Sequence, residues 1–198
     1  MGTSSDPGSS TEHAVTTSSP PTGRGVGAPV MLPADGGRAI GGGGSVHARL
    51  LVTHDHPAYA STFEMRVAPG FDVGAHVHRD GEEMFFVLEG ELDILCFEPL
   101  DRTIGDWHQW KDGSGQVYLR GGPGAFMYVP PGTPHAFANP TSDPVRMFFQ
   151  SSVKGGHENY FAELGELLRE SRGKPAPAAV RDLEAKYGTE QLTAMQAG

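Results

Sequence analysis

Residues 70–90 read GFDVGAHVHRDGEEMFFVLEG, and the spacing G-x5-H-x-H-x4-E-x6-G within this stretch decides the fold. Alternate residues of a β-strand face the same side of the sheet, so His76 and His78 should project together. Arg79–Gly81 predicts a turn, because glycine tolerates the backbone angles of a tight reversal. Glu83 then begins a returning strand, where its carboxylate can face the two imidazoles.

A second spaced stretch lies at residues 124–139, GAFMYVPPGTPHAFAN, with the pattern G-x5-P-x-G-x2-H-x3-N. A strand should end at Pro130, because proline cannot donate to the hydrogen-bond ladder. The Pro-Pro-Gly-Thr-Pro segment that starts there predicts a chain reversal. His135 opens the next strand, and this geometry can return one more imidazole to the same pocket.

Three neutral imidazoles and one carboxylate form a borderline-hard donor set that suits one divalent transition metal ion. Iron, manganese, cobalt, nickel, copper(II) and zinc all fit such a set, whereas Cu(I) and thiolate clusters do not. Four protein ligands leave further coordination positions open for water, dioxygen or a substrate oxygen.

The two stretches resemble the two signature motifs of the cupin superfamily, and the resemblance holds at all ten fixed positions. It implies that the metal ligands are His76, His78, Glu83 and His135. It implies structural roles for Gly90, Pro130, Gly132 and Asn139.

The remaining pattern predicts an all-β fold with helices at the C-terminal end. Short candidate strands, separated by Gly, Pro, Asp and Asn, cover residues 47–52, 62–68, 74–78, 83–88, 91–97, 107–110, 116–119, 125–129, 136–139 and 146–150. Such strands are typical of antiparallel sandwiches and barrels, and the cupin resemblance implies a double-stranded β-helix, or jelly roll. Apolar residues at helical spacing predict one helix over 159–169, and a second should run from Pro177 to about Tyr187.

Composition divides the chain into three parts. Residues 1–45 are rich in Gly, Ser and Pro, and residues 1–28 contain no Leu, Ile, Phe, Trp or Tyr, so a flexible tail is expected. Residues 46–155 should form the cupin barrel and residues 156–198 a helical extension. The stretch 91–123 is longer than the minimal family spacing, which predicts an added hairpin over 101–121.

Charge and cysteine content limit the partners. The net charge of −9 argues against a nucleic-acid partner. No apolar stretch approaches a transmembrane length, and the first residues lack the basic and apolar regions of a signal peptide. The single Cys96 excludes an internal disulfide and suits the cytoplasm. The open sheet edges of a small barrel favour a homodimer, which is common among cupins.

Strand parity suggests residues for an apolar pocket wall. Phe85 and Val87 share the face of Glu83, and Phe137 shares the face of His135. Packing inside the barrel without ligand contact explains these three residues equally well. Tyr128 could orient a substrate or donate a proton, but a strand residue with its hydroxyl at the rim explains it better.

Other histidines and the cysteine give weaker signals. His54 and His56 repeat the H-x-H pattern, but no carboxylate or third histidine follows at a useful spacing, so a polar turn is the better interpretation. His108 is expected at the surface, and Cys96 as a small buried apolar residue. His157 belongs to no pattern.

Three functions stay open at this point. The first is a metal-dependent dioxygenase resembling quercetinases, which would act on a small enolic or phenolic, flavonol-like substrate. That resemblance implies that Glu83 is both a metal ligand and the general base. The second is a non-redox, metal-dependent polyketide cyclase, dehydratase or isomerase. The third is a small-molecule binding cupin without turnover.

Overall fold

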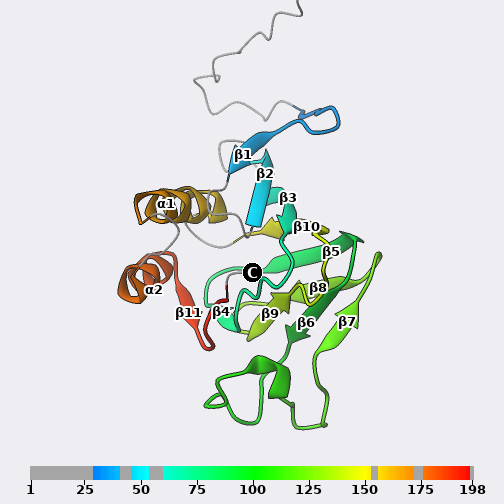
Figure 1. Ribbon diagram of the computed structural model, residues 1–198, viewed down its shortest axis with the longest axis vertical. Coiled ribbons are helices and arrows are strands. Elements are labelled where there is room, and N and C mark those ends of the chain that lie inside the picture. Colours follow the sequence, from blue (N-terminus) through cyan, green and yellow to red (C-terminus); the bar gives the residue numbers. More distant parts are fainter. Residues whose placement is uncertain (1–28, 41–45, 54–59, 153–155, 172–175, 197–198) are drawn as a thin grey trace, which may run out of the picture.

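The computed structural model of the protein describes residues 29–40, 46–53, 60–152, 156–171 and 176–196 (Figure 1). Two antiparallel sheets pack around a common core, with strand orders β1-β2-β3-β10-β5-β8 and β11-β4-β9-β6-β7. The strands are β1 (Arg38–Ile40), β2 (Val46–Val52), β3 (Ser61–Val67), β4 (His76–His78), β5 (Glu83–Glu89), β6 (Leu92–Cys96), β7 (Leu119–Gly121), β8 (Phe126–Val129), β9 (His135–Ala138), β10 (Val145–Ser151) and β11 (Thr189–Gln191). The predicted all-β jelly roll with C-terminal helices is confirmed.

In the six-stranded sheet, every second side chain points into the barrel. On β5, Glu83, Phe85 and Val87 are buried while Phe86 is exposed, which is the period of a strand with one face on a core. Phe85 stands opposite Phe149 of β10, and their stacked ring centroids lie 4.7 Å apart. This alternation places Glu83 on the inner face.

The three central strands of the five-stranded sheet, β4, β9 and β6, are buried on both faces. The four residues of β9 are all buried, because inward residues such as Phe137 meet the barrel core while Ala136 meets a second cluster on the other face. Trp107 and Trp110 belong to that second cluster and are almost fully buried.

The structure does not form the hairpin that is predicted over residues 101–121, and two buried tryptophans explain the difference. Trp107–Gln109 forms a single 3-10 turn, and only Leu119–Gly121 is a strand, paired with β6. The indole of Trp107 donates to Asp72 Oδ1 at 2.9 Å, and that of Trp110 donates to the Ile104 carbonyl at 2.8 Å. Burial of two large indoles, each with a hydrogen-bond acceptor, favours a packed cover over an exposed hairpin.

Two of the motif positions have clear structural roles. Gly90 has a φ of +82°, and a Cβ there would lie 2.8 Å from Val145 Cγ2, so only glycine fits the turn between β5 and β6. The buried Asn139 side chain donates to the carbonyls of Val67 and Asp143 at 3.1 and 2.8 Å. It also accepts from the backbone N–H of Thr141 at 3.0 Å, so this side chain ties the loop after β9 to the end of β3.

The helices α1 (His157–Glu170) and α2 (Pro177–Lys186) lie beside the barrel (Figure 1). Phe161 of α1 packs edge-on against Phe63 of β3, with ring centroids 5.5 Å apart. Among the described helices none has the length and apolar character needed to cross a membrane. Helix α1 begins at His157, two residues before the predicted start at residue 159.

Two strands, β1 and β11, occur where no strand is predicted. Each has three residues, which are too few to show the alternating apolar and polar pattern of a strand in the sequence. Strand β1 lies within the stretch 1–45 predicted as a tail and pairs with β2, whereas β11 pairs with β4. The predictions for residues 1–28 and 41–45, and for His54 and His56, lie outside the described residues.

Candidate metal centre

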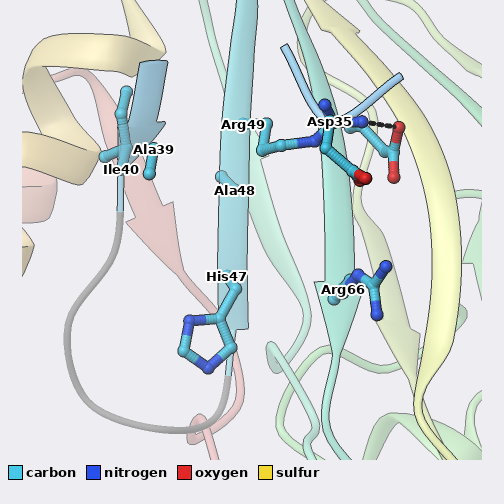
Figure 2. Close-up of a pocket in the computed structure, with 8 residues that line it drawn as sticks. Asp35, Ala39, Ile40, His47, Ala48, Arg49 and Arg66 are labelled. Atoms are coloured by element: carbon cyan, nitrogen blue, oxygen red, sulfur yellow. Dashed lines mark hydrogen bonds and ion pairs between the residues drawn. The ribbon is translucent and has the colours of Figure 1, made fainter. Parts of the chain in front are cut away.

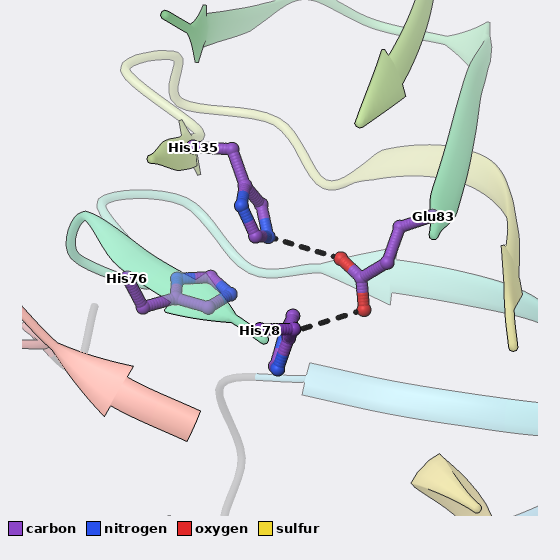
Figure 3. A group of neighbouring side chains, drawn as sticks. All are labelled: His76, His78, Glu83 and His135. Atoms are coloured by element: carbon purple, nitrogen blue, oxygen red, sulfur yellow. Dashed lines mark hydrogen bonds and ion pairs between the residues drawn. The ribbon is translucent and has the colours of Figure 1, made fainter. Parts of the chain in front are cut away.

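Four buried side chains converge between the two sheets (Figure 3). His76 and His78 come from β4, Glu83 is the first residue of β5, and His135 is the first residue of β9. Each of the four residues offers one possible ligand atom, and these four atoms all lie within 4.8 Å of one another. His76 and His135 are paired across neighbouring strands, and the carboxylate approaches them from the other sheet. The structure therefore brings together the four predicted ligands in a cluster that could hold one metal ion.

Backbone carbonyls fix the orientation of two of the imidazoles. His76 Nδ1 lies 2.9 Å from the Gly74 carbonyl, and His135 Nδ1 lies 3.0 Å from the Thr133 carbonyl. A carbonyl oxygen only accepts hydrogen bonds, so each Nδ1 carries the hydrogen, and in the neutral ring each Nε2 keeps its lone pair. This arrangement is the usual support for a histidine that binds metal through Nε2.

His78 is held similarly by a hydroxyl. Its Nδ1 lies 3.1 Å from Thr189 Oγ1 on β11, the strand that pairs with β4. Its Nε2 is buried and has no hydrogen-bond partner among the described residues. A buried nitrogen without a partner costs free energy unless another group, such as a metal ion, occupies its lone pair.

The Glu83 carboxylate shows the same need for a cation. Its Oε2 lies 3.0 Å from His135 Nε2, and its Oε1 lies 3.3 Å from His78 Nε2 (Figure 3). Within the described part of the chain, Oε1 is also buried without a hydrogen-bond partner. Because His135 Nε2 and the carboxylate are both acceptors in the neutral tautomer, only a shared proton or metal cation stabilises their approach. The residues therefore fit a transition metal ion.

The charge states also suit metal binding. Burial lowers the pKa of His78 to about 3, and burial likewise holds the pKa of His76 well below its usual range. Both rings are therefore neutral near pH 7. Burial alone would raise the pKa of Glu83, but the adjacent imidazoles of His78, His157 and His135 outweigh it, and the pKa is lowered. The site thus offers neutral imidazoles and an ionised carboxylate.

The metal-free protein should lose stability as the pH falls from about 6.5 to about 3. In the unfolded chain His76 and His78 take up protons near pH 6.5, whereas in the folded protein His78 does so only near its pKa of about 3. The unfolded state binds more protons in this range, so the free energy of unfolding should fall by up to about 1.4 kcal/mol per pH unit for each imidazole. Urea denaturation at several pH values measures the slope.

The control for this prediction is the double variant His76→Asn/His78→Asn. An asparagine amide nitrogen sits near the place of Nδ1, so residue 76 can still donate to the Gly74 carbonyl. The variant lacks both imidazoles and should have a flatter dependence of stability on pH. Equal slopes in the two proteins would contradict the prediction.

His157 is a member of the site that the sequence does not reveal. Its Nδ1 lies 3.3 Å from Glu83 Oε1 and 2.6 Å from Ser151 Oγ, and its ring is buried. Burial lowers its pKa, with Glu83 opposing. No motif includes this residue, because its approach to Glu83 depends on where α1 docks. The only usable signal was a histidine at the start of an amphipathic helix.

Three of the expected wall residues face the barrel interior. Phe85, Val87 and Phe137 are buried, and the ring centroid of Phe85 lies 6.4 Å from that of His135. Phe149 extends this apolar wall through its stacking on Phe85. Contact of these residues with a substrate stays a prediction.

Tyr128 does not belong to this wall, which corrects its place among the predicted pocket residues. Met127 and Val129 occupy the inward positions of β8, so Tyr128 between them faces outward and is exposed. Its hydroxyl donates to Glu82 Oε2 at 2.7 Å. The structure thus places this hydroxyl on the outer face of the sheet.

His108 and Cys96 are not among the four clustered side chains, although Cys96 is paired with His135 across β6 and β9. His108 is partly exposed and stacks on Trp107, with ring centroids 3.7 Å apart. Cys96 is half-buried, and its thiol donates to the Tyr128 carbonyl at 3.3 Å. Burial raises the pKa of this thiol to about 11, which leaves it protonated and unreactive at neutral pH.

A separate hollow of about 230 Å³ lies on the outer side of β2 and β3 (Figure 2). It is lined by Asp35, Ala39, Ile40, His47, Ala48, Arg49, Glu64 and Arg66. Arg49 and Glu64 form an ion pair across it. None of the four clustered side chains lines this hollow, so it is distinct from the candidate metal centre.

The fold and the cluster together define a jelly-roll protein with a buried site of three histidines and one glutamate. Residues 58–170 match the family model described as Cupin, so the chain belongs to the cupin family. None of the curated proteins compared with the chain matches it.

Solved structures give distant matches to the fold. One is the sugar phosphate isomerase of the cupin superfamily from Silicibacter pomeroyi, with 18% identity, a TM-score of 0.46, and coverage of 61% of this chain and 74% of that chain. Another is the polyketide cyclase RemF from Streptomyces resistomycificus, with 20% identity, a TM-score of 0.45, and coverage of 63% and 78%. The cupin domain of Cnp3 from Schizosaccharomyces pombe gives 11% identity, a TM-score of 0.41, and coverage of 54% and 59%, so the chain spans less than two thirds of that protein.

Proposed function

We propose that the protein is a metal-dependent dioxygenase, similar to quercetinases, that acts on a small enolic or phenolic substrate such as a flavonol. The observation that carries this proposal is the buried Glu83 carboxylate, whose Oε1 has no hydrogen-bond partner within the described residues. Its position among three imidazoles gives it two uses, as a metal ligand and as a proton acceptor. The metal identity is left open among iron, manganese, nickel, cobalt, copper and zinc.

His76, His78, His135 and Glu83 would hold the ion, which would supply Lewis-acid polarisation and, if redox-active, electron exchange with dioxygen. Glu83 accepts the proton of the substrate hydroxyl, because an ionised carboxylate within reach of that hydroxyl is a competent general base. Although burial opposes it, the adjacent imidazoles of His78, His157 and His135 lower the pKa of this carboxylate, which favours its ionised form. The protein thus turns the enol into its more reactive anion.

The apolar wall supports an aromatic substrate and exclusion of water. Phe85, Phe137 and Phe149 form a continuous set of rings, with centroids 5.7 Å apart for Phe85 and Phe137 and 4.7 Å apart for Phe85 and Phe149. Rings of this kind pack against a flat aromatic molecule and lower the local dielectric constant. Dioxygen, which is apolar, also partitions into such surroundings.

The direct test is oxygen uptake by the purified protein after loading with each candidate metal in turn. Flavonols and related enols are the substrates, and an oxygen electrode records the rate. We expect uptake of one dioxygen per enol consumed with at least one redox-active metal. Substrate conversion that continues without oxygen and with zinc would instead establish the non-redox cyclase, dehydratase or isomerase. Tight binding of the enol without conversion under any condition would establish a binding protein.

A homodimer and a cytoplasmic location are also part of the proposal. Strand β8 ends its sheet, and Phe126 on this strand is exposed beside Phe86 of β5. Pairing of two such edges would bury these rings and satisfy the open backbone groups. Light scattering of the purified protein measures the oligomeric state.

A further inference from the structure

We propose that His157, at the first position of α1, is a positioning residue that fixes the orientation of the Glu83 carboxylate in the metal centre. The inference rests on the proposed metal centre but not on the dioxygenase reaction. It adds a residue from outside both sequence motifs and makes the docking of α1 part of the site.

The distances place His157 on the open side of the carboxylate. Its Nδ1 lies 3.3 Å from Glu83 Oε1, as close as His78 Nε2 does to the same oxygen. Glu83 Oε2 is engaged on the other side, 3.0 Å from His135 Nε2. Rotation of the carboxylate is therefore restricted from both ends, by His135 at Oε2 and by His157 at Oε1.

Ser151 explains why His157 acts on Glu83 as a support and not as a further ligand. The hydroxyl of this last residue of β10 lies 2.6 Å from His157 Nδ1. Next to an ionised carboxylate, the favourable tautomer carries its hydrogen on Nδ1, which donates to the Ser151 hydroxyl and attracts Glu83 Oε1 electrostatically at 3.3 Å without a hydrogen bond. A nitrogen that carries hydrogen has no lone pair to offer an ion.

Packing fixes the imidazole of His157 in this place. Its ring centroid lies 5.0 Å from that of His78, in an edge-to-face arrangement. The rings of Phe149 and Phe161 lie at 5.3 and 5.5 Å from it. These contacts come from β4, β10 and α1, so the orientation of His157 follows from the docking of the helix on the barrel.

The test compares two substitutions of His157 in the full-length protein, with Co²⁺ as the probe metal. His157→Leu fills the space but removes the N–H, whereas in His157→Asn an amide nitrogen sits near the place of Nδ1. We expect the leucine variant to bind Co²⁺ about 10- to 100-fold more weakly and the asparagine variant to stay within about threefold of the unaltered protein, as for other residues that orient metal ligands. The visible absorption spectrum of bound Co²⁺ should shift in the leucine variant, because the carboxylate changes its coordination.

Tyr187→Phe is the matched control, since the Tyr187 hydroxyl donates to Glu163 of α1 at 2.6 Å and so helps to hold this helix, whereas no contact within the described residues joins Tyr187 to His157 or Glu83. It should lower the thermal stability and leave the Co²⁺ spectrum unchanged. Equal Co²⁺ affinity and spectrum in His157→Leu and the unaltered protein would overturn the positioning role alone. A failure of the unaltered protein to bind Co²⁺ would overturn the metal centre and this inference with it.

Discussion

The double variant His76→Asn/His78→Asn should bind no transition metal under conditions in which the unaltered protein binds one ion per chain. The two residues supply half of the clustered donors and lie two positions apart on β4. Asparagine removes each Nε2 but can keep the hydrogen bond to the Gly74 carbonyl, so the strand should fold. Elemental analysis after dialysis against the metal gives the stoichiometry, and circular dichroism verifies the fold.

The same change should abolish the stabilisation that metal gives the folded protein. At a free metal concentration of about 100 times the dissociation constant, binding adds about 2.7 kcal/mol to the free energy of unfolding. For a chain of this size that corresponds to a rise in Tm of roughly 5–11 °C. The unaltered protein should show this rise and the double variant should show none.

A second pair of histidines provides the control. His47 is exposed on β2 and His108 is partly exposed beside Trp107, and neither belongs to the cluster. His47→Asn/His108→Asn should still bind one ion per chain and show the full rise in Tm. Loss of metal in this control, or full metal content in the His76/His78 variant, would place the site elsewhere.

Strand parity explains why so much of the cluster could be predicted from the sequence. The period of two along β4 and β5 puts His76 and His78 on one face and Glu83 on the inner face of the opposite sheet, before any contact is known. The family resemblance added His135, which is distant in sequence and comes close only through the reversal at 130–134. The same parity places Tyr128 outward, because its neighbours Met127 and Val129 are the apolar residues that face the core.

Other features depend on packing that has no local signal. Residues 107–110 are predicted as a strand, yet Trp107 and Trp110 are both buried against the outer face of the five-stranded sheet, and the chain forms a 3-10 turn there. His157 reaches Glu83 only because α1 docks through Phe161 on the barrel. Both cases involve contacts between segments far apart in the chain, which neither periodicity nor spacing can represent.

Glu83→Gln should lower the rate of oxygen uptake by a factor of about 100 to 10,000 at full metal occupancy, which is the range for removal of a general base. Glutamine keeps the shape of the side chain and one oxygen that can still approach the ion. It loses the negative charge and can no longer accept the substrate proton. Oxygen-electrode rates with a flavonol, measured on samples of verified metal content, give the ratio.

Full occupancy is the condition that separates the two roles of Glu83. If Glu83 acts only as an anionic ligand, its loss weakens metal binding, and added metal restores the rate of oxygen uptake. If Glu83 is also the base, the rate stays low even when the site is saturated with metal. Glu82→Gln is the neighbouring control, because Glu82 accepts from Tyr128 on the outer face and should not affect the rate. An unchanged rate in metal-saturated Glu83→Gln would overturn the role of this carboxylate as the base, and the substrate would then have to reach the site already ionised.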